Sequence, residues 1–303
     1  MASLQAILSE QSAPNGVMPS LKSGRRQRTL QSVAKVVGVG MVTGVPTTLS
    51  LLPAPEHTGL LFRRSDLPGL PTIQARVSSV LDTTRRTTLG VGQTRVTLVE
   101  HVLAALAGLQ VDNCIIELNA EEPPGLDGSS EGYVHALLQA GVSEQQTFKP
   151  LLELNHPISV QQNGASLTLY PRQGKGLAIS YLLDYGVDSP ITAQSHTEVL
   201  TPESFQKDIA HCRTFVLERE ALELQRQGVG RHLKASELLV FGEQGLIDNT
   251  LRFPNEPARH KILDIVGDLS LCGFDISGHV VAYRSGHPMN IELAKALTRI
   301  VDH

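Results

Sequence analysis

The chain has 303 residues, of which 41% are hydrophobic and 18% are charged, and its formal net charge is −4. These values are typical of a globular protein long enough for two domains, and they exclude polyanion binding by the molecule as a whole. Tryptophan is absent and aromatic residues make up only 4%, which argues against recognition of nucleic acid by base stacking. We therefore expect no nucleic-acid partner.

The cysteines and the first segment of the chain bear on cellular location. Cys114, Cys212 and Cys272 lie far apart in apolar surroundings and form no Cys-x-x-Cys pair, so we interpret them as core residues of a protein from a reducing compartment. No apolar run is long enough to span a bilayer. Residues 1–26 lack the apolar segment of a secretion signal. We predict that they form a disordered extension of a cytoplasmic protein.

Residues 27–146 are predicted to form a first α/β domain. Short β-favouring runs bounded by proline or glycine alternate there with runs in which apolar residues recur at helical spacing. The expected elements, in chain order, are strands at 45–52 and 59–64, a helix that starts near Thr97 and ends at Gly108, a strand at 113–119 and a helix that ends near Gly141.

The start of the first helix carries two residues of chemical interest. Thr97 precedes Glu100 by three residues, which is the pattern of a capping box. Glu100 could thus serve only as a cap, with His101 a satisfied polar neighbour. A carboxylate next to an imidazole is also the pair that a general base and a metal ligand require, and a helix N-terminus favours the ionised carboxylate that a base needs. Both interpretations stay open on this evidence.

Residues 147–303 are predicted to form a second α/β domain after a polar linker at Glu144–Lys149. A threonine cap followed by proline opens one of its helices. The expected elements are strands at 151–160, 165–170 and 177–184, a helix that opens at Thr201-Pro202, a helix over 259–272, a strand at 279–284 and a last helix from Met289.

The helix over 259–272 offers two further metal donors. His260 and Asp264 are four residues apart and share one helix face, and Asp268 continues that face by one turn. A hydrogen-bonded surface pair has the same spacing. Together with His101, however, they make three protein donors, and three donors leave one position of a zinc ion open for water, as in zinc hydrolases.

A weak internal repeat relates the two halves of the chain. His101 and His260 are each followed seven residues later by a glycine, and each begins a helix that leads into a strand. We interpret this repeat as a duplication that would place the metal between two similar domains, where ligand sites are often found.

His287 is a further candidate. It lies in the turn Arg284–Pro288 between a strand and a helix. Reactive groups are often displayed in such turns, although glycine and proline are also common in turns that have only a structural role. Pairing with Asp268 would favour its protonated form, which can stabilise an oxyanion or donate a proton.

Several motifs in this order resemble those of the UDP-3-O-acyl-N-acetylglucosamine deacetylases, zinc enzymes of the committed step of lipid A synthesis. The similarity runs from about Gln27 to His303. The matching stretches are QRTL (27–30), LLPAPEHTGLLFRR (51–64), VEHVLAALAGLQVDN (99–113), LDGS (126–129), CRTF (212–215), LRF (251–253), RHKILDIVGDL (259–269) and YRSGHPMNI (283–291).

The resemblance implies an α+β fold of two similar two-layer α/β sandwich domains, each a sheet with helices on one face, with the active site between them. An insert around 216–250 would form a passage for the acyl chain. Zn²⁺ would be the cofactor and UDP-3-O-acyl-N-acetylglucosamine the substrate. The implied roles are metal ligation by His101, His260 and Asp264, general-base catalysis by Glu100, oxyanion stabilisation by Thr214, acid or oxyanion assistance by His287 oriented by Asp268, and substrate contact by Lys261 and Phe215.

Three stretches depart from the family pattern. Val42 stands where a histidine is common, Arg85-Arg86 add charge, and Arg231–Ala235 replace a small-residue run. These departures concern the substrate passage rather than the metal ligands.

Two other functions remain as alternatives: a zinc deacetylase of another N-acetylated sugar, and a non-catalytic paralogue that binds nucleotide-sugar or lipid. We expect a monomer that makes at most transient contact with the inner membrane surface, because no anchor is visible.

Overall fold

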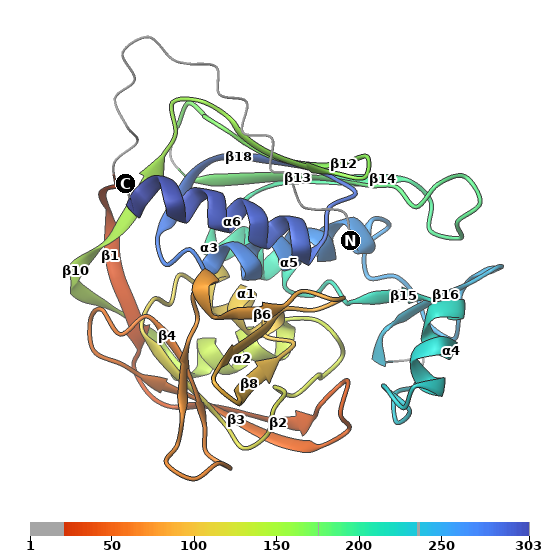
Figure 1. Cartoon of the computed structure of the whole chain (residues 1–303), viewed down its shortest axis with the longest axis horizontal. Coiled ribbons are helices and arrows are strands. Elements are labelled where there is room, and N and C mark those ends of the chain that lie inside the picture. The colour runs from red at the N-terminus through yellow and green to blue at the C-terminus, as the bar shows by residue number, and fades with distance from the viewer. Residues whose placement is uncertain (1–20, 175, 235–236, 303) are drawn as a thin grey trace.

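The computed structural model describes residues 21–174, 176–234 and 237–302, which form a mixed α+β fold. Two large β-sheets lie on opposite sides of the molecule, with the helices α1 (Glu100–Gly108), α2 (Glu131–Ala140), α5 (Glu256–Ser270) and α6 (His287–Asp302) between them (Figure 1). Within the described residues, no helix combines the length and the apolar composition that crossing a bilayer requires.

The first sheet has the strand order β2-β3-β9-β4-β5. Only the contact between β9 and β4 is parallel, and the other pairs are antiparallel. Burial alternates along β3 and β9 because one face of the sheet packs on helices. The elements of this half are β2 (Ala34–Val39), β3 (Pro46–Pro53), β4 (Leu60–Arg64), β5 (Thr72–Gln74), α1 (Glu100–Gly108), β9 (Cys114–Leu118) and α2 (Glu131–Ala140).

The second sheet contains the same five-strand pattern, β11-β12-β18-β13-β14, again with one parallel contact, between β18 and β13. In both sheets the last strand in sequence is inserted between the second and the third. Two long strands, β1 and β10, extend this sheet, and β10 pairs with the beginning of β18. The elements are β1 (Leu21–Leu30), β10 (Val142–Glu153), β11 (Ile158–Gln162), β12 (Ala165–Tyr170), β13 (Leu177–Leu183), β14 (Gln194–Val199), α5 (Glu256–Ser270), β18 (Asp275–Tyr283) and α6 (His287–Asp302).

Two small sheets and several short elements complete the described fold. The strands β6, β7 and β8 belong to the first half, and β15, β16 and β17, with α4, lie in the second half. The bounds are η1 (Val77–Ser79), β6 (Val80–Asp82), β7 (Thr88–Val91), β8 (Thr94–Thr97), α3 (Pro202–Ser204), the π-helical turn Phe205–Ile209, β15 (Phe215–Leu217), α4 (Glu218–Arg226), β16 (Leu239–Gly242) and β17 (Gly245–Leu246).

Helix α1 lies at the centre of the molecule. Residues 100–106 are all buried, because one side of the helix faces the first sheet and another packs on α5. A helix covered on several sides is apolar around most of its circumference, and α1 follows this rule except at Glu100 and His101. Two polar residues in the buried part of this helix therefore require a special environment.

Gly267 permits the close approach of α5 to the start of α1. A Cβ atom at Gly267 would lie 2.3 Å from the carbonyl oxygen of Glu100. No backbone contact of this kind tolerates a methyl group without movement, so the glycine fixes the spacing of the two helices.

Gly267→Ala is expected to destabilise the protein by about 1–3 kcal/mol through overpacking, despite the roughly 1 kcal/mol that alanine gains over glycine in a helix. Urea unfolding measures the change. Arg299→Ala, at an exposed position of α6, serves as the control and should stay within about 0.5 kcal/mol. A more stable Gly267→Ala protein would mean that the two helices separate easily.

Several sequence predictions are wrong at the level of elements. Residues 21–26 belong to β1 rather than to a disordered extension, and residues 1–20 lie outside the described part of the chain. The expected linker Glu144–Lys149 is part of β10, where its polar residues alternate along a strand that pairs with β1. The expected strand at 151–160 is interrupted at 154–157, and β14 was not predicted.

The capping box is also wrong. Thr97 is the last residue of β8, and its hydroxyl contacts that of Thr88. The chain then turns through Leu98, whose φ of 55° is in the left-handed region, and α1 begins without a side-chain cap. Glu100 is therefore not part of a capping box, and its carboxylate contacts Thr87 and His287 instead.

Candidate metal centre and active site

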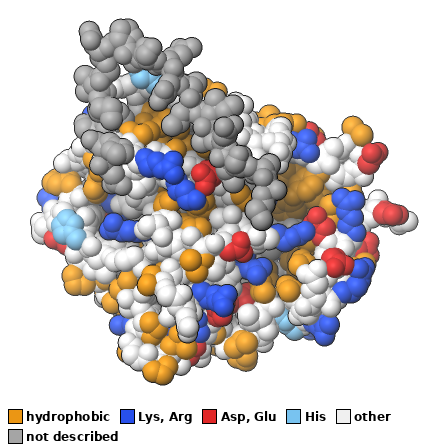
Figure 2. Space-filling model, in the orientation of Figure 1, with side chains coloured by type: hydrophobic (Ala, Val, Ile, Leu, Met, Phe, Trp, Pro, Cys, Tyr) orange, Lys and Arg blue, Asp and Glu red, His pale blue; other side chains and the backbone are white. Residues whose placement is uncertain are grey.

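A cleft of about 930 Å³ opens between the two halves, where the N-terminus of α1 faces the side of α5. The strands and helix of the 215–247 region form one wall. Figure 2 shows acidic and basic side chains intermixed on the visible face, in keeping with the small net charge. Every residue of the predicted site except Asp268 lines this cleft, namely Glu100, His101, Thr214, Phe215, His260, Lys261, Asp264 and His287.

His101, His260 and Asp264 converge as the sequence analysis expected. One donor atom from each lies within 4.8 Å of the others, and all three side chains are buried. The imidazole rings of His101 and His260 have centroids 5.2 Å apart. His101 comes from α1 and the other two from α5, so the set exists only because these helices pack together.

The chemistry of this set fits a zinc ion. His260 donates its Nδ1 hydrogen to the Cys212 carbonyl at 3.0 Å, which leaves Nε2 as a free electron pair. Asp264 Oδ1 is buried without a hydrogen-bond partner and lies 3.4 Å from that Nε2. Two donors bound at about 2.0 Å to one tetrahedral ion stand about 3.3 Å apart. A bound cation would thus satisfy an otherwise orphaned buried oxygen.

The charges around the set are consistent with metal binding. Burial, aided by the neighbouring His260, lowers the pKa of His101 to about 3, so the imidazole is neutral and able to ligate. Burial also lowers the pKa of His260. Burial alone would raise the pKa of Asp264. The attraction of Lys261 and the histidines is larger in sum and holds this pKa below its usual value. A metal ligand must be deprotonated, and these shifts favour the deprotonated form of all three groups.

Glu100 lies beside the set without belonging to it. Its Oε2 accepts the backbone N–H of Thr87 at 3.0 Å, and its Oε1 lies 3.8 Å from His287 Nε2. Burial raises the pKa of its carboxyl to about 7, with His287 opposing the shift and Asp268 adding to it. A carboxylate with a pKa near neutrality is a competent general base. A helix N-terminus by itself would lower the pKa of this carboxyl, and burial supplies the opposing effect that raises it.

His287 and Asp268 form a buried pair. The Nδ1 hydrogen of His287 is donated to Asp268 Oδ2 at 2.8 Å. Burial would lower the pKa of this imidazole, but Asp268, Asp264 and Glu100 outweigh that effect and raise it to about 9. His287 is therefore a cation at neutral pH, and it faces Glu100 across the cleft.

Three further residues of the predicted site line the cleft. Lys261 donates to Asp264 Oδ2 at 2.7 Å, and its Nζ lies 5.3 Å from the centre of the Phe215 ring. Burial opposes the charge of Lys261, yet Asp264 raises its pKa above the usual value. Thr214 is fixed by its backbone, which donates to the Gly128 carbonyl at 2.8 Å and accepts from Leu239. The LDGS and CRTF motifs are therefore in contact.

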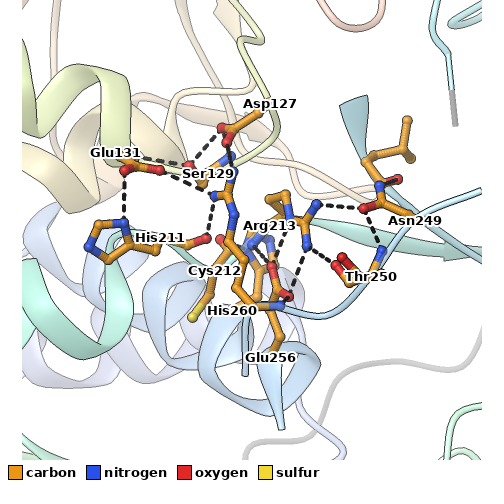
Figure 3. A network of polar contacts seen from close by, with 12 residues as sticks. Asp127, Ser129, Glu131, His211, Cys212, Arg213, Asn249, Thr250, Glu256 and His260 are labelled. Atoms are coloured by element: carbon orange, nitrogen blue, oxygen red, sulfur yellow. Dashed lines mark hydrogen bonds and ion pairs between the residues drawn. The ribbon is translucent and has the colours of Figure 1, made fainter. Parts of the chain in front are cut away.

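A buried ion pair lies behind His260, one of the three candidate metal donors (Figure 3). The Arg213 guanidinium bonds to both carboxylate oxygens of Glu256, and Arg213 and Glu256 are 5% and 0% exposed. Arg213 also donates to Asn249 and to the Thr250 carbonyl. Because Arg213 follows Cys212 directly, this pair holds in place the carbonyl that orients His260.

Glu256→Ala is expected to destabilise the protein by about 3–5 kcal/mol, because it leaves the Arg213 guanidinium charged, buried and unpaired. Urea unfolding is the measurement. Glu223→Ala removes the exposed Glu223–Arg226 pair and is the matched control, with an expected effect below about 1 kcal/mol. Equal losses for the two variants would contradict the buried pair's structural role.

The three departures from the family pattern contact the cleft or its wall. Val42, Arg85, Arg86 and Lys234 line it. The Val42 carbonyl accepts from Gly230 at 3.3 Å, and Arg85 pairs with Glu220 of α4 at 3.2 Å. Ala235 lies outside the described residues.

Comparison with known proteins places this arrangement in a family. The family description "UDP-3-O-acyl N-acetylglycosamine deacetylase" matches residues 27–299. The chain belongs to this deacetylase family. It is an enzyme of the hydrolase class, and the metal donors, Glu100 and His287 all lie within the matched region.

Curated relatives agree with the family match. The UDP-3-O-acyl-N-acetylglucosamine deacetylase of Chlamydia felis is 41% identical over 90% of this chain and 97% of its own length. That of Nostoc sp. is 39% identical over 90% of this chain and 98% of its own. The bifunctional enzyme LpxC/FabZ of Chlorobaculum tepidum is 36% identical over 91% of this chain, which spans only 65% of that longer protein.

Sequence reasoning missed the residues that support the site. Thr87, Arg213 and Glu256 contact site residues or the carbonyl beside them. Arg213 lay in a recognised motif, CRTF, which was a usable signal. Thr87 carried no local signal, because its partners are 13 and 181 residues away along the chain.

Proposed function

We propose that this enzyme hydrolyses the acetamide of UDP-3-O-acyl-N-acetylglucosamine, with Zn²⁺ held by His101, His260 and Asp264, to give the free amine and acetate. The observation that carries the proposal is the convergence of these three donors with Glu100 and His287 at one end of a large cleft. The family and the names of the relatives supply the substrate.

The two halves are proposed to be similar two-layer α/β domains, residues 27–146 and 147–303, with an insert around 216–250. The shared five-strand pattern and the equivalent positions of α1 and α5 support this division. The insert would contain α4 and two strands of the small sheet that walls the cleft, and apolar residues there (Leu222, Leu224, Val229 and Leu233) suit contact with an acyl chain.

When bound, the zinc ion would supply Lewis-acid polarisation of the amide carbonyl and a lowered pKa for water. Glu100, in its ionised form, accepts a proton from the water that adds to the acetyl carbon. His287, charged and oriented by Asp268, stabilises the developing oxyanion, with Thr214 as a second donor. The C–N bond then breaks and the amine takes up a proton, leaving acetate. The proton comes from Glu100 or His287, since both face the same space.

Substrate binding is proposed to use both walls of the cleft. Lys261, whose charge is retained despite burial, would approach the phosphates of the nucleotide. Phe215, whose ring stands 6.3 Å from that of His260, would contact the sugar region. The acyl chain would bring the enzyme into transient contact with the inner membrane surface, and we propose a cytoplasmic monomer. A vesicle-pelleting assay at low and high salt, with the mass measured by sedimentation, tests both points.

The deciding experiment is an acetate-release assay on acylated and unacylated UDP-N-acetylglucosamine. We expect release from the acylated compound and at least about 10²-fold less from the unacylated one, because remote binding energy contributes to catalysis. Equal rates would favour a deacetylase of other N-acetylated sugars. Binding of the acylated compound without any release, in protein that contains zinc, would favour a non-catalytic paralogue.

A further inference from the structure

Thr87 is placed between the two catalytic groups of the proposed reaction. It lies directly before β7 and is 0% exposed. Its contacts reach the first turn of α1, the interior of α5 and the beginning of α6, at Glu100, Asp268 and His287 respectively. Among the described residues, Thr87 is the one that hydrogen-bonds to both Glu100 and Asp268, and His287 hydrogen-bonds to Asp268 and lies 3.8 Å from Glu100.

The Thr87 hydroxyl is one of three hydrogen-bond donors to the Asp268 carboxylate. This carboxylate is 0% exposed, so each lone pair without a partner is costly. Oδ2 accepts from His287 Nδ1 at 2.8 Å and from Asn290 Nδ2 at 2.9 Å. Oδ1 accepts from the Thr87 hydroxyl at 2.6 Å. The hydroxyl therefore fixes the rotation of the carboxylate, and this rotation sets the direction in which the His287 ring points.

The Thr87 backbone performs the corresponding task for Glu100. Its N–H donates to Glu100 Oε2 at 3.0 Å, and its carbonyl accepts the N–H of Val99 at 3.3 Å. One carboxylate oxygen is thereby held on the backbone, and Oε1 is the oxygen that faces His287 Nε2. A single residue thus bonds both Glu100, the proposed base, and Asp268, the partner of His287.

We infer that Thr87 is a positioning residue whose hydroxyl, acting through Asp268, keeps His287 in register with Glu100 for the attack on the amide carbonyl. The inference rests on the proposed function. Loss of the hydrogen-bond partner that orients a metal ligand costs about 10- to 100-fold in metal affinity or activity, and we expect a loss of similar size for a partner that orients a catalytic histidine. The β-branched side chain of threonine has few χ1 rotamers, which suits it to this task.

The test compares Thr87→Val, Thr87→Ser and Thr88→Val in the full-length enzyme. Valine has the shape of threonine without the hydroxyl, and serine restores the hydroxyl. Thr88→Val is the matched control, because it removes a buried hydroxyl from the adjacent residue that bonds Thr97 and no catalytic group. Each protein is assayed for kcat and KM with the acylated substrate, for bound zinc and for its urea midpoint.

We expect Thr87→Val to lower kcat by about 10- to 100-fold with KM and zinc content unchanged, Thr87→Ser to regain most of the loss, and Thr88→Val to keep kcat within about twofold. Equal kcat losses for the two valine variants, in step with their urea midpoints, would show a purely structural role and overturn the inference. Full activity of Thr87→Val would overturn it too. Failure of the wild-type enzyme to release acetate would refute the proposed function instead.

Discussion

Glu100→Gln is expected to lower kcat for acetate release by about 10²- to 10⁴-fold, the usual contribution of a general base. Glutamine has the shape of glutamate and its amide oxygen can still accept the Thr87 N–H, so the start of α1 should be preserved. The variant cannot take a proton from water. Since Glu100 is not among the three metal donors, bound zinc should be unchanged.

The measurement pairs steady-state acetate release with metal analysis of the same sample. Glu121→Gln is a suitable control, because its side chain makes an exposed ion pair with Arg95 and is not part of the cleft lining. Near-normal turnover by a zinc-loaded Glu100→Gln enzyme would remove Glu100 from the role of base. A loss of activity in parallel with a loss of zinc would show that the residue supports the metal instead.

Removal of a metal donor should have an effect of similar or greater size. His260→Ala is expected to abolish tight zinc binding and to lower acetate release by at least about 10³-fold, because a bound metal contributes several kcal/mol to the stabilisation of transition-state charge. It also leaves the Cys212 carbonyl, now accepting from His260 Nδ1, without its partner.

Chelation of the wild-type enzyme should reproduce this loss, and added zinc should restore activity to the wild type but not to the variant. His279→Ala is the control, since His279 bonds Ser180 on β13, in the second sheet, and has no contact with the metal donors. Because an ion that binds only the folded state stabilises it by mass action, chelation should also lower the wild-type melting temperature. Full activity after complete removal of metal would contradict the proposed chemistry.

Local patterns in the sequence predicted which residues share one helix, but not how residues from different helices come together in the site. The four-residue spacing of His260 and Asp264 placed both on one face of α5, and the structure agrees. No periodicity relates residues 159 positions apart, so their grouping with His101 was a hypothesis from donor type and from the weak similarity of the two halves, and the resemblance then implied the same set. The contact depends on a glycine that lets α5 touch the backbone of Glu100.

The incorrect predictions have a common physical origin. Thr97 and Glu100 have capping-box spacing, yet the strand β8 continues to Thr97 and a left-handed residue separates the two. Glu144–Lys149 are polar, yet they alternate along a paired strand. The conformation of both segments depends on partners that are distant in sequence, and these partners cannot be predicted from local composition.

The division of the site between α1 and α5 has a consequence for how the enzyme must be made. The α1 stretch contributes the imidazole of His101 and the proposed base, and the stretch from α5 to the beginning of α6 contributes the other two donors and His287. Either stretch synthesised by itself would carry an incomplete set of groups. Catalytic competence should therefore emerge only after the chain as far as His287 has left the ribosome and packed against the half that was translated first.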